Sequence, residues 1–429
     1  MTMVEATLQS PPAAMPNSGH TALAALEGLR VLDLSGATGN YAGKLFADMG
    51  ADVVLVEPPG GTELRREPPF IDGVPGIERS LSFAYQNTSK RGIALDLDTA
   101  SGQRLLRELA ATADLVIETA PPGWMAARGI GYDDLARLRP QIVVASITPF
   151  GQTGPYAQMK ATDLVALALG GLLWMGGYQD AAPTQAHGEQ AFKCAAMYGA
   201  VAAMLAVTEA ELTGQGQHAD ISMQESVTLA LENAAQTYDL EGVVRKRPLS
   251  DQRFAGYGLF PCKDGYIYLG SRGIGNSPAW SRSLQWFKDE NMEGVDRLFG
   301  AEWSDLDYLK GNEARDVFGE LFMRWSRQHS KDWLYSEGQK RLIPLAPVST
   351  PADLLENPQL QARGHFVPFV HPLLERAASM PGAPYVLSET PWQLYRPAPS
   401  LGQHTAEVLA EVGVSQDDLQ RLYAAGVVA

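Results

Sequence analysis

The polar segment 187–190 holds the residues with the clearest capacity for chemistry, because it stands directly before the most apolar run of the chain. Glu189 and His187 lie in this segment, and nearly every residue from Ala191 to Val207 is apolar. If the run forms a helix, the positive end of the helix dipole lies beside Glu189 and favours an anion or a carboxylate there. We therefore expect an active site at this end. Glu189 is either a carboxylate nucleophile or an acid that only stabilises the helix terminus, and His187 is either a base beside it or a solvated loop residue.

The apolar run predicts a central core helix over 191–212. A helix that is apolar all round must be surrounded by protein or by lipid. Lys193 and the short length argue against a membrane span, so we expect protein on all sides and no transmembrane helix. Cys194, inside the run, is expected to be a small core residue. Gly214 and Gly216 supply the end of the helix.

Composition bounds the class of protein. The 429 residues, 45% hydrophobic and 19% charged, suffice for two domains with substantial cores. The net charge of −15 and the lack of a long Lys/Arg run argue against nucleic acid as a partner. Cys194 and Cys262 are far apart and lack metal-type spacing, so we expect no metal site and a cytoplasmic location. Residues 1–21, rich in Pro, Ala and Ser, are interpreted as a disordered tail and not as a signal peptide.

Strand-like and helical patterns alternate from Leu29 to Ile147. Short β-branched runs separated by amphipathic segments are typical of parallel strands joined by helices. The predicted fold class is therefore α/β, with a doubly wound, Rossmann-like sheet. The glycines between 36 and 43 do not match the G-x-G-x-x-G spacing, so no nicotinamide cofactor is indicated. Ligands of such sheets bind at the carboxyl ends of the strands, which here are the segments 35–38, 58–62, 119–123 and 148–154.

The chain changes in character after Asp251. A hairpin is predicted over 256–270, with Asp264–Gly265 as its turn, and helical segments rich in Trp and Phe follow it. We expect a second, smaller α+β domain over 251–355. Two short amphipathic helices are predicted within 405–429.

Several different short motifs are spread along nearly the whole chain: Leu26–Asp33, Ala47–Glu57, Asn87–Leu97, Thr213–Gln217 with Asp220–Met223, Arg341–Val348, Gly382–Pro384 and Leu401–His404. Together they resemble the family III CoA-transferases, whose members include formyl-CoA:oxalate and carnitine CoA-transferases and the related α-methylacyl-CoA racemases. No motif is strong by itself, and their order and number make the resemblance specific.

The resemblance implies a Rossmann-like large domain built from 22–232 and the C-terminal segment 367–429, a small domain inserted between them, and two subunits interlocked as a dimer. It implies coenzyme A, carried as an acyl-CoA, and a carboxylic acid as ligands. In the family a carboxylate of the enzyme attacks the thioester, CoA leaves as its thiolate, and a mixed anhydride forms. The thiolate then returns to give an enzyme–CoA thioester, which the acceptor acid resolves. A glycine-rich loop, here 270–275, serves as a lid.

The resemblance and the strand ends together place CoA on the large domain. Lys90 and Arg91 would hold CoA phosphates through charge-assisted hydrogen bonds, or they bridge acids within the fold. The residues expected to bind CoA are Lys90, Arg91, Leu95, Asp98, Thr119, Ala120, Arg128, Thr148 and Phe150.

The sequence departs from the family at the reacting residue. The family nucleophile is an aspartate shortly before the buried helix, and counting back from Thr213 by the family's spacing reaches Phe192, which cannot be acylated. Glu189 is the nearest carboxylate. The racemase pattern is also incomplete, because Thr162 stands where the racemases carry a histidine before Asp163.

Two hypotheses follow. The chain is a CoA-transferase that acts through Glu189, or it is the inactive subunit of a heteromeric, benzylsuccinate-type transferase with an aspartate-bearing homologue; homodimer and heteromer both stay open.

Overall fold

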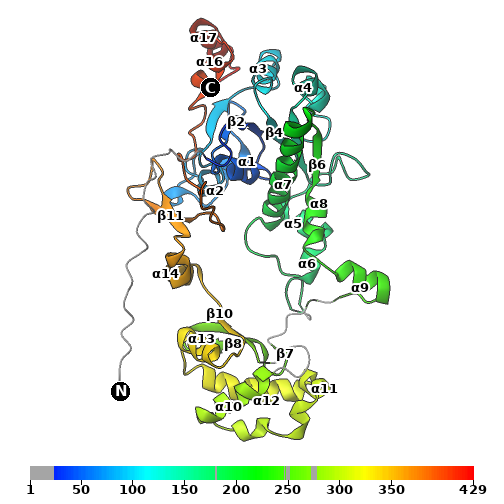
Figure 1. Cartoon of the computed structure of the whole chain (residues 1–429), viewed down its shortest axis with the longest axis vertical. Helices are drawn as coiled ribbons and strands as arrows, with labels where there is room; N and C mark the ends of the chain where they lie inside the picture. The colour runs from blue at the N-terminus through cyan, green and yellow to red at the C-terminus, as the bar shows by residue number, and fades with distance from the viewer. Residues whose placement is uncertain (1–23, 179–180, 246, 248–251, 272–277) are drawn as a thin grey trace. The chain divides into compact units, whose positions relative to one another are not determined.

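The computed structural model describes residues 24–178, 181–245, 247, 252–271 and 278–429. The chain divides into two compact units, each taken by itself below (Figure 1). Unit 1 contains the residues up to Leu172, Ala186–Ala235 and Pro358–Ala429, and unit 2 contains Leu173–Gln185 and Gln236–Asn357. Segment 173–185 therefore groups with unit 2, whereas the sequence analysis placed it in the large domain. The predicted tail and most of the predicted glycine loop lie outside the described residues.

Unit 1 is built on a six-stranded, wholly parallel sheet with the order β3-β2-β1-β4-β5-β6. Its strands β3, β4 and β5 are buried along their whole length, as expected where helices cover both faces of a parallel sheet. This strand order is that of the Rossmann fold, so the predicted fold class is confirmed. The strands are β1 (Arg30–Leu34), β2 (Asp52–Glu57), β3 (Arg91–Ala94), β4 (Leu115–Glu118), β5 (Val143–Thr148) and β6 (His218–Ser222).

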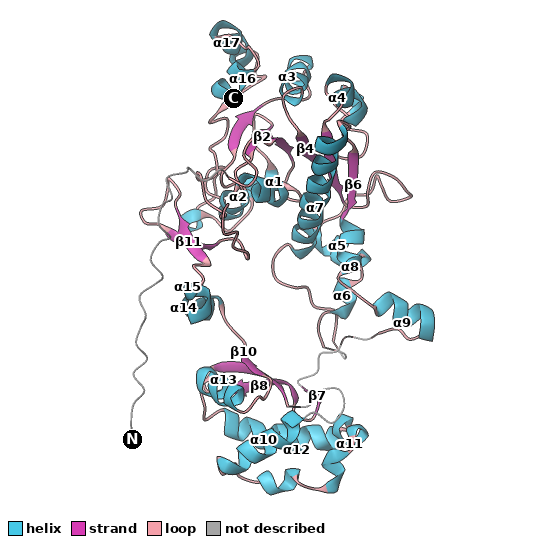
Figure 2. Cartoon of the chain, viewed as in Figure 1, coloured by secondary structure: helices cyan, strands magenta, loops and turns pink. Residues whose placement is uncertain are grey.

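Helices cover both faces of this sheet (Figure 2). Val144 of β5 shares a core with helices α3, α4, α16 and α17, whereas Ile147 of the same strand approaches Gly199 of α7. Because side chains alternate along a strand, residues 144 and 147 face opposite sides, so α7 covers the other face. The helices of unit 1 are α1 (Asn40–Ala47), α2 (Leu81–Gln86), α3 (Ala100–Ala110), α4 (Tyr132–Leu138), α5 (Asp163–Leu169), α7 (Gln190–Thr213), α8 (Met223–Leu229), α15 (Pro358–Ala362), α16 (Thr405–Glu411) and α17 (Gln416–Ala424).

Helix α7 is the longest helix of the described chain and is only half enclosed. Small residues such as Ala195, Gly199 and Ala203 are buried against the sheet and its neighbours. On the opposite side Val201 is 58% exposed and Leu205 is 68% exposed. The prediction that protein surrounds the whole helix is therefore wrong for the single chain. Among the described helices, α7 is also the one long and apolar enough to cross a membrane by length and composition, but its contacts with the sheet identify it as a core helix.

Two pieces of unit 1 come from the C-terminal part of the chain. A short antiparallel pair, β11 (Phe366–Phe369) and β12 (Ala378–Pro381), packs with α2 residues, and α16 and α17 close the core beneath the sheet. The two helices predicted near the C-terminus are thus confirmed.

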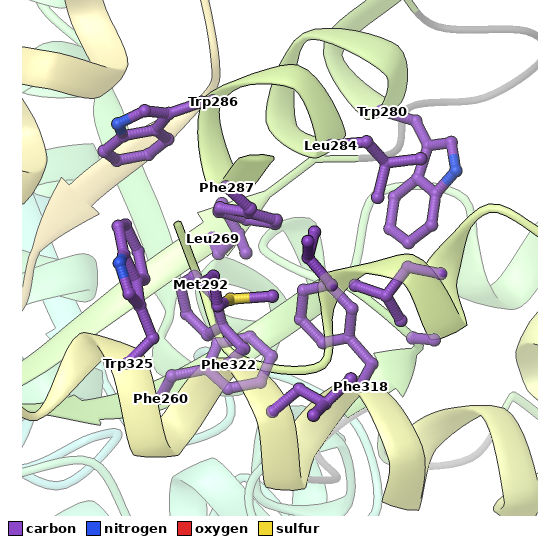
Figure 3. Close-up of a cluster of buried hydrophobic side chains, with 14 of the residues drawn as sticks. Phe260, Leu269, Trp280, Leu284, Trp286, Phe287, Met292, Phe318, Phe322 and Trp325 are labelled. Atoms are coloured by element: carbon purple, nitrogen blue, oxygen red, sulfur yellow. The ribbon is translucent and has the colours of Figure 1, made fainter. Parts of the chain in front are cut away.

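Unit 2 combines an antiparallel sheet of order β10-β9-β8-β7 with three described helices of ten or more residues, α10, α12 and α13. Strands β8 (Tyr257–Cys262) and β9 (Gly265–Gly270) pair as an antiparallel hairpin, which confirms the predicted hairpin. Its turn is formed by Lys263 and Asp264 and not by Asp264–Gly265 as predicted, because Gly265 already pairs with Cys262 in the sheet. An aromatic core that includes Trp286, Phe318 and Trp325 joins sheet and helices (Figure 3). The other elements are β7 (Gln252–Phe254), β10 (Leu345–Pro347), α10 (Pro278–Asp289), α11 (Leu306–Lys310), α12 (Asn312–Ser326), α13 (Lys331–Lys340) and α14 (Pro351–Glu356), while α6 (Leu172–Met175) and α9 (Ala234–Glu241) lie at the boundaries between the units.

Candidate functional site

The start of α7 faces a cavity of about 680 Å³ within unit 1. Loops that follow the carboxyl ends of β1, β2 and β4 form most of its wall, as expected for the ligand-binding edge of a doubly wound sheet. The segment before α5 and the first turn of α7 complete it. Its lining residues are Gly36, Ala37, Thr38, Pro58, Gly61, Thr62, Glu63, Glu67, Thr119, Ala161, Thr162, Asp163, Leu164, Glu189 and Phe192.

Asp163 caps the N-terminus of α7 from a different helix. Its Oδ1 accepts hydrogen bonds from the backbone N–H groups of Ala191, at 2.7 Å, and of Phe192, at 3.2 Å. Asp163 is buried. It is also the first residue of α5, and the Thr162 side chain caps the N-terminus of that helix. The positive end of α7 is therefore already compensated by an acid of the same chain.

Glu189 and Phe192 both reach the cavity from the start of α7, and both are half-buried. Glu189 is the N-cap residue, yet within the described chain its side chain makes no capping hydrogen bond to α7. Burial raises the pKa of Glu189, Glu67 and Asp163 raise it further, and Lys193 opposes them. The site therefore stabilises the neutral form of Glu189 relative to the same group in water.

Two further acids enter the same cavity from the loop after β2. Glu67 is half-buried, and burial followed by repulsion from Glu63 raises its pKa. Glu63 is exposed. Sequence reasoning pointed to the end of this strand but missed both acids, because their approach to the start of α7 depends on tertiary contacts between segments far apart in the chain.

A second, smaller cavity of about 230 Å³ lies at the carboxyl ends of β1 to β4. Of the residues predicted to bind CoA, Leu95, Asp98, Thr119 and Ala120 line it. Arg128 lies beside it, with its guanidinium 3.8 Å from the ring centre of Trp124 and hydrogen-bonded to Asp98 at 2.5 and 3.0 Å. The structure thus brings five of the nine predicted residues to one place.

Thr119 borders both cavities. Thr119 and Pro58 line each of them. The Thr119 hydroxyl accepts the backbone N–H of Gly36 at 2.9 Å, which ties the loop after β4 to the loop after β1. The two cavities are therefore neighbours at the same edge of the sheet.

Lys90 and Arg91 are engaged inside the fold. The Lys90 ammonium is fully buried and donates to Asp33 at 2.6 Å, to the carbonyl of Asn40 and to the side chain of Asn87, which uses its three N–H groups. Arg91 forms ion pairs with Asp52, Glu407 and Glu411. Of the two interpretations of this pair, the geometry favours bridging of internal acids over phosphate binding.

The other predicted positions lie outside both cavities. Thr148 is fully buried at the end of β5, and Phe150 packs edge-on against Tyr156 with ring centres 5.8 Å apart. His187 is exposed, and Cys194 donates through its thiol to the carbonyl of Ser226. Within the described residues, no cluster of three or more His, Cys, Asp or Glu side chains is placed to hold a metal ion.

A family model described as CoA-transferase family III matches residues 26–405. The subunit BbsE of succinyl-CoA:(R)-benzylsuccinate CoA-transferase from Thauera aromatica is 39% identical over 93% of this chain and 97% of its own. A succinate–glutarate CoA-transferase from Agrobacterium fabrum is 32% identical over 90% of this chain and 95% of its own.

Solved structures agree with the fold. A CAIB/BAIF family protein from Brucella suis superposes with a TM-score of 0.79 at 28% identity, covering 91% of this chain and all of the other. The protein Rv3272 from M. tuberculosis gives a TM-score of 0.73 at 21% identity, over 90% of this chain and 99% of its own, which supports the fold alone.

Proposed function

Because the chain belongs to CoA-transferase family III, we propose that it is the non-nucleophilic subunit of a CoA-transferase that also contains an aspartate-bearing homologous chain. The observation that carries the proposal is Phe192. It lines the cavity at the start of α7, at the position that the family's spacing assigns to the nucleophilic aspartate. A phenyl ring cannot attack a thioester.

We further propose that this chain holds CoA across its two neighbouring cavities. The nucleotide would occupy the cavity at the strand ends, bordered by Trp124 and Arg128, where a guanidinium stacked on an indole offers a planar, cationic edge. The pantetheine arm would pass Pro58 and Thr119 toward α7. Lys90 and Arg91 are left out of this assignment because their charged groups are satisfied by internal acids.

The chemistry would take place on the partner. Its aspartate would attack the thioester carbon of an acyl-CoA, the C–S bond would break, and CoA would leave as its thiolate while a mixed anhydride forms. The relatives described above are named for reactions of succinyl-CoA or succinate with a second dicarboxylic acid. We extend this class to the assembled enzyme, with a dicarboxylyl-CoA as donor and a carboxylic acid as acceptor.

Assembly is proposed from the apolar side of α7. Met197, Val201 and Leu205 follow one another at helical spacing and are more than half exposed in the single chain. A contiguous apolar stripe of this kind marks a protein interface, so we propose that the chain interlocks with a homologous subunit in the manner of the family. Both cysteines are free thiols, which supports the proposed cytoplasmic location.

The test is to purify the chain alone and together with an aspartate-bearing homologue from the same genome, and to follow succinyl-CoA consumption with dicarboxylic acceptors by liquid chromatography. We expect no turnover by the chain alone and turnover by the complex, abolished when the partner's aspartate is changed to alanine. Turnover by the chain alone, at a rate comparable to the complex, would overturn the proposal.

A second candidate function follows from one observation: Glu189 lines the same cavity as Phe192. If the chain alone is active, Glu189 is the acid at the start of α7 placed to form the anhydride. Glu189→Gln would then abolish turnover, and in the wild type hydroxylamine would attack the glutamyl–CoA thioester, release CoA and leave a hydroxamate on Glu189. Glu375→Gln, at an exposed acid in another part of unit 1, is the matched control and is expected to keep the wild-type rate.

A further inference from the structure

Three polar side chains form a hydrogen-bonded chain from the smaller cavity, at the strand ends, to the outer edge of the sheet. Glu118 lines that cavity at the end of β4, and the Ser146 side chain of β5 is its hydrogen-bond partner. The Ser146 hydroxyl lies 2.8 Å from Nε2 of His218, on the edge strand β6. Glu118 and Ser146 are buried, whereas His218 is exposed. One hydroxyl and one imidazole ring thus connect a buried carboxyl group with the surface.

The register of the sheet produces this alignment. Glu118 pairs with Ser146 in the parallel ladder, and Ser146 pairs with Asp220, so these side chains point to the same face of the sheet. His218 precedes Asp220 by two residues and therefore lies on that face as well. Its ring stacks on Tyr132 with ring centres 5.7 Å apart, which orients the imidazole toward Ser146.

The Ser146 hydroxyl couples the two ends, because it has one hydrogen and donates to one neighbour at a time. When Glu118 is ionised, Ser146 donates to the carboxylate and accepts from Nε2–H of His218. When Glu118 is protonated, it donates to Ser146, which then donates to a bare Nε2, and the ring hydrogen of His218 lies on Nδ1. The tautomer of His218 therefore follows the charge of Glu118.

The groups around Glu118 give it uncharged donors and one acid. The Ser146 hydroxyl and the N–H of Ala120 donate to its carboxyl group, and Asp220 faces it from β6. The other acids that line the cavity each have a partner: Arg65 for Glu57, Arg128 for Asp98, and the backbone N–H of residue 98 for Asp96.

Both ends of the chain of hydrogen bonds have protonation states suited to proton transfer near neutral pH. Burial raises the pKa of Glu118 to about 7 against the two hydrogen bonds that it accepts. Burial lowers the pKa of His218, although Asp220 and Asp133 oppose this, so its imidazole is neutral in the same range. A neutral imidazole can accept a proton on one nitrogen and release one from the other.

We propose that Glu118, Ser146 and His218 form a proton relay, through which the smaller cavity takes up a proton from solvent when an organic phosphate binds there. Phosphate groups close to Glu118 favour its neutral form, because anions in a partly buried site repel one another. A proton enters the ring at Nδ1 of His218, the hydrogen on Nε2 passes to Ser146, and the hydroxyl hydrogen passes to Glu118. Ser146 and His218 keep their number of hydrogens, and Glu118 gains one.

The relay itself is tested without ligand, in the full-length chain with its histidines labelled with nitrogen-15. NMR between pH 6.5 and pH 8.5 should show the His218 ring change from the Nδ1–H to the Nε2–H tautomer as the pH rises through about 7. His218→Gln assigns the signal. Ser146→Ala and the isosteric Glu118→Gln should each hold one tautomer over this range, and Glu375→Gln, at an exposed acid, should behave as the wild type. A wild-type tautomer that does not change, or one that still changes in Ser146→Ala, would overturn the relay.

Proton uptake on binding rests on the placement of the CoA nucleotide proposed above. It is measured by isothermal titration calorimetry with CoA at pH 7.5, in Hepes and in Tris, whose ionisation enthalpies differ. We expect the wild type to take up roughly half a proton or more per CoA, because most of Glu118 is ionised before binding. Glu118→Gln should take up almost none, and Glu375→Gln should match the wild type.

Equal uptake by the wild type and Glu118→Gln, or CoA binding to the wild type without uptake, would contradict the role of the relay in ligand binding. Absence of CoA binding would contradict it too. These outcomes are distinct from failure of the proposed non-nucleophilic role, which is diagnosed by turnover of the chain alone.

Discussion

Glu118 ends strand β4 at the floor of the smaller cavity, with its carboxyl group 4% exposed. Burial raises its pKa to about 7, hydrogen bonds from Ser146 and from the backbone N–H of Ala120 oppose that rise, and Asp220 adds to it. The parallel register places Glu118 beside Ser146, and Ser146 beside Asp220, so the three groups form one row across the sheet edge. The Ser146 hydroxyl also lies 2.8 Å from Nε2 of His218.

This buried carboxyl should make the stability of the protein depend on pH. The folded state holds the proton up to about pH 7, whereas the unfolded chain releases it near 4.5, so the folded state binds more protons between these values. The free energy of unfolding must therefore fall as the pH rises through this window. Glu118→Gln, which stays neutral, should lose this dependence, a difference on the order of 1–3 kcal/mol between pH 5.5 and pH 8.

Urea denaturation followed by far-UV circular dichroism at the two pH values measures the effect, with Glu375→Gln as the control that keeps the wild-type slope. If wild type and Glu118→Gln lose equal stability between pH 5.5 and pH 8, the Glu118 carboxyl is not the group responsible.

The contacts of single side chains were the features that the sequence predicted least well. The end of each strand could be located from its apolar run, and the family resemblance together with the strand ends predicted CoA contacts for Leu95, Asp98, Thr119 and Ala120, which line one cavity. The partner of a charge could not be located, since Asp33 and Lys90 are 57 residues apart and meet only through the pairing of β1, β2 and β3. Whether Lys90 met a phosphate or a buried acid depended on that contact.

At the scale of elements, the turn from α7 into β6 depends on Gly216. Its N–H donates to the carbonyl of Pro140 at 2.8 Å, its own carbonyl accepts from the Tyr132 hydroxyl at 3.0 Å, and a Cβ here would collide with the carbonyl oxygen of Ile142. Backbone atoms cannot move aside as a side chain can. Gly216→Ala should therefore destabilise the protein by about 1–3 kcal/mol.

Gly60→Ala is the matched control, because the nearest atom to its added Cβ, in the Arg66 side chain, lies 3.8 Å away. Its effect should stay within about 0.5 kcal/mol. Thermal or urea denaturation of the two variants tests the pair, and equal stability of Gly216→Ala and Gly60→Ala would refute the close approach of the two backbones.

The pattern of elements could be predicted well for β1 to β5 because each strand is a short β-branched run between helical segments. β6 (His218–Ser222) was not predicted as a strand, since its polar start, His-Ala-Asp, conceals the pattern. The opposite error occurred for α7. A uniformly apolar sequence predicts that a helix is buried on all sides. It does not show whether its own chain or a neighbouring subunit covers each side.

At the scale of the whole molecule, that ambiguity becomes a prediction about assembly. The apolar stripe on α7 consists of Met197, Val201 and Leu205, and it ends at the exposed polar residues Thr208 and Glu209. Water contact with this apolar surface is unfavourable by roughly 25 cal/mol per Å². We therefore expect the wild-type chain to form dimers or heteromers at micromolar concentration.

Val201→Glu with Leu205→Glu should abolish this assembly, because burying two unpaired carboxylates in an apolar interface costs several kcal/mol. Both side chains point away from the sheet in the single chain, so the subunit itself should stay folded. Sedimentation velocity should give a monomer for the double variant and an oligomer for the wild type, with unchanged far-UV circular dichroism. Leu138→Glu, at a half-exposed leucine that ends α4, is the matched control and should sediment as the wild type does. A monomeric wild type, or a double variant that still assembles, would place the interface elsewhere.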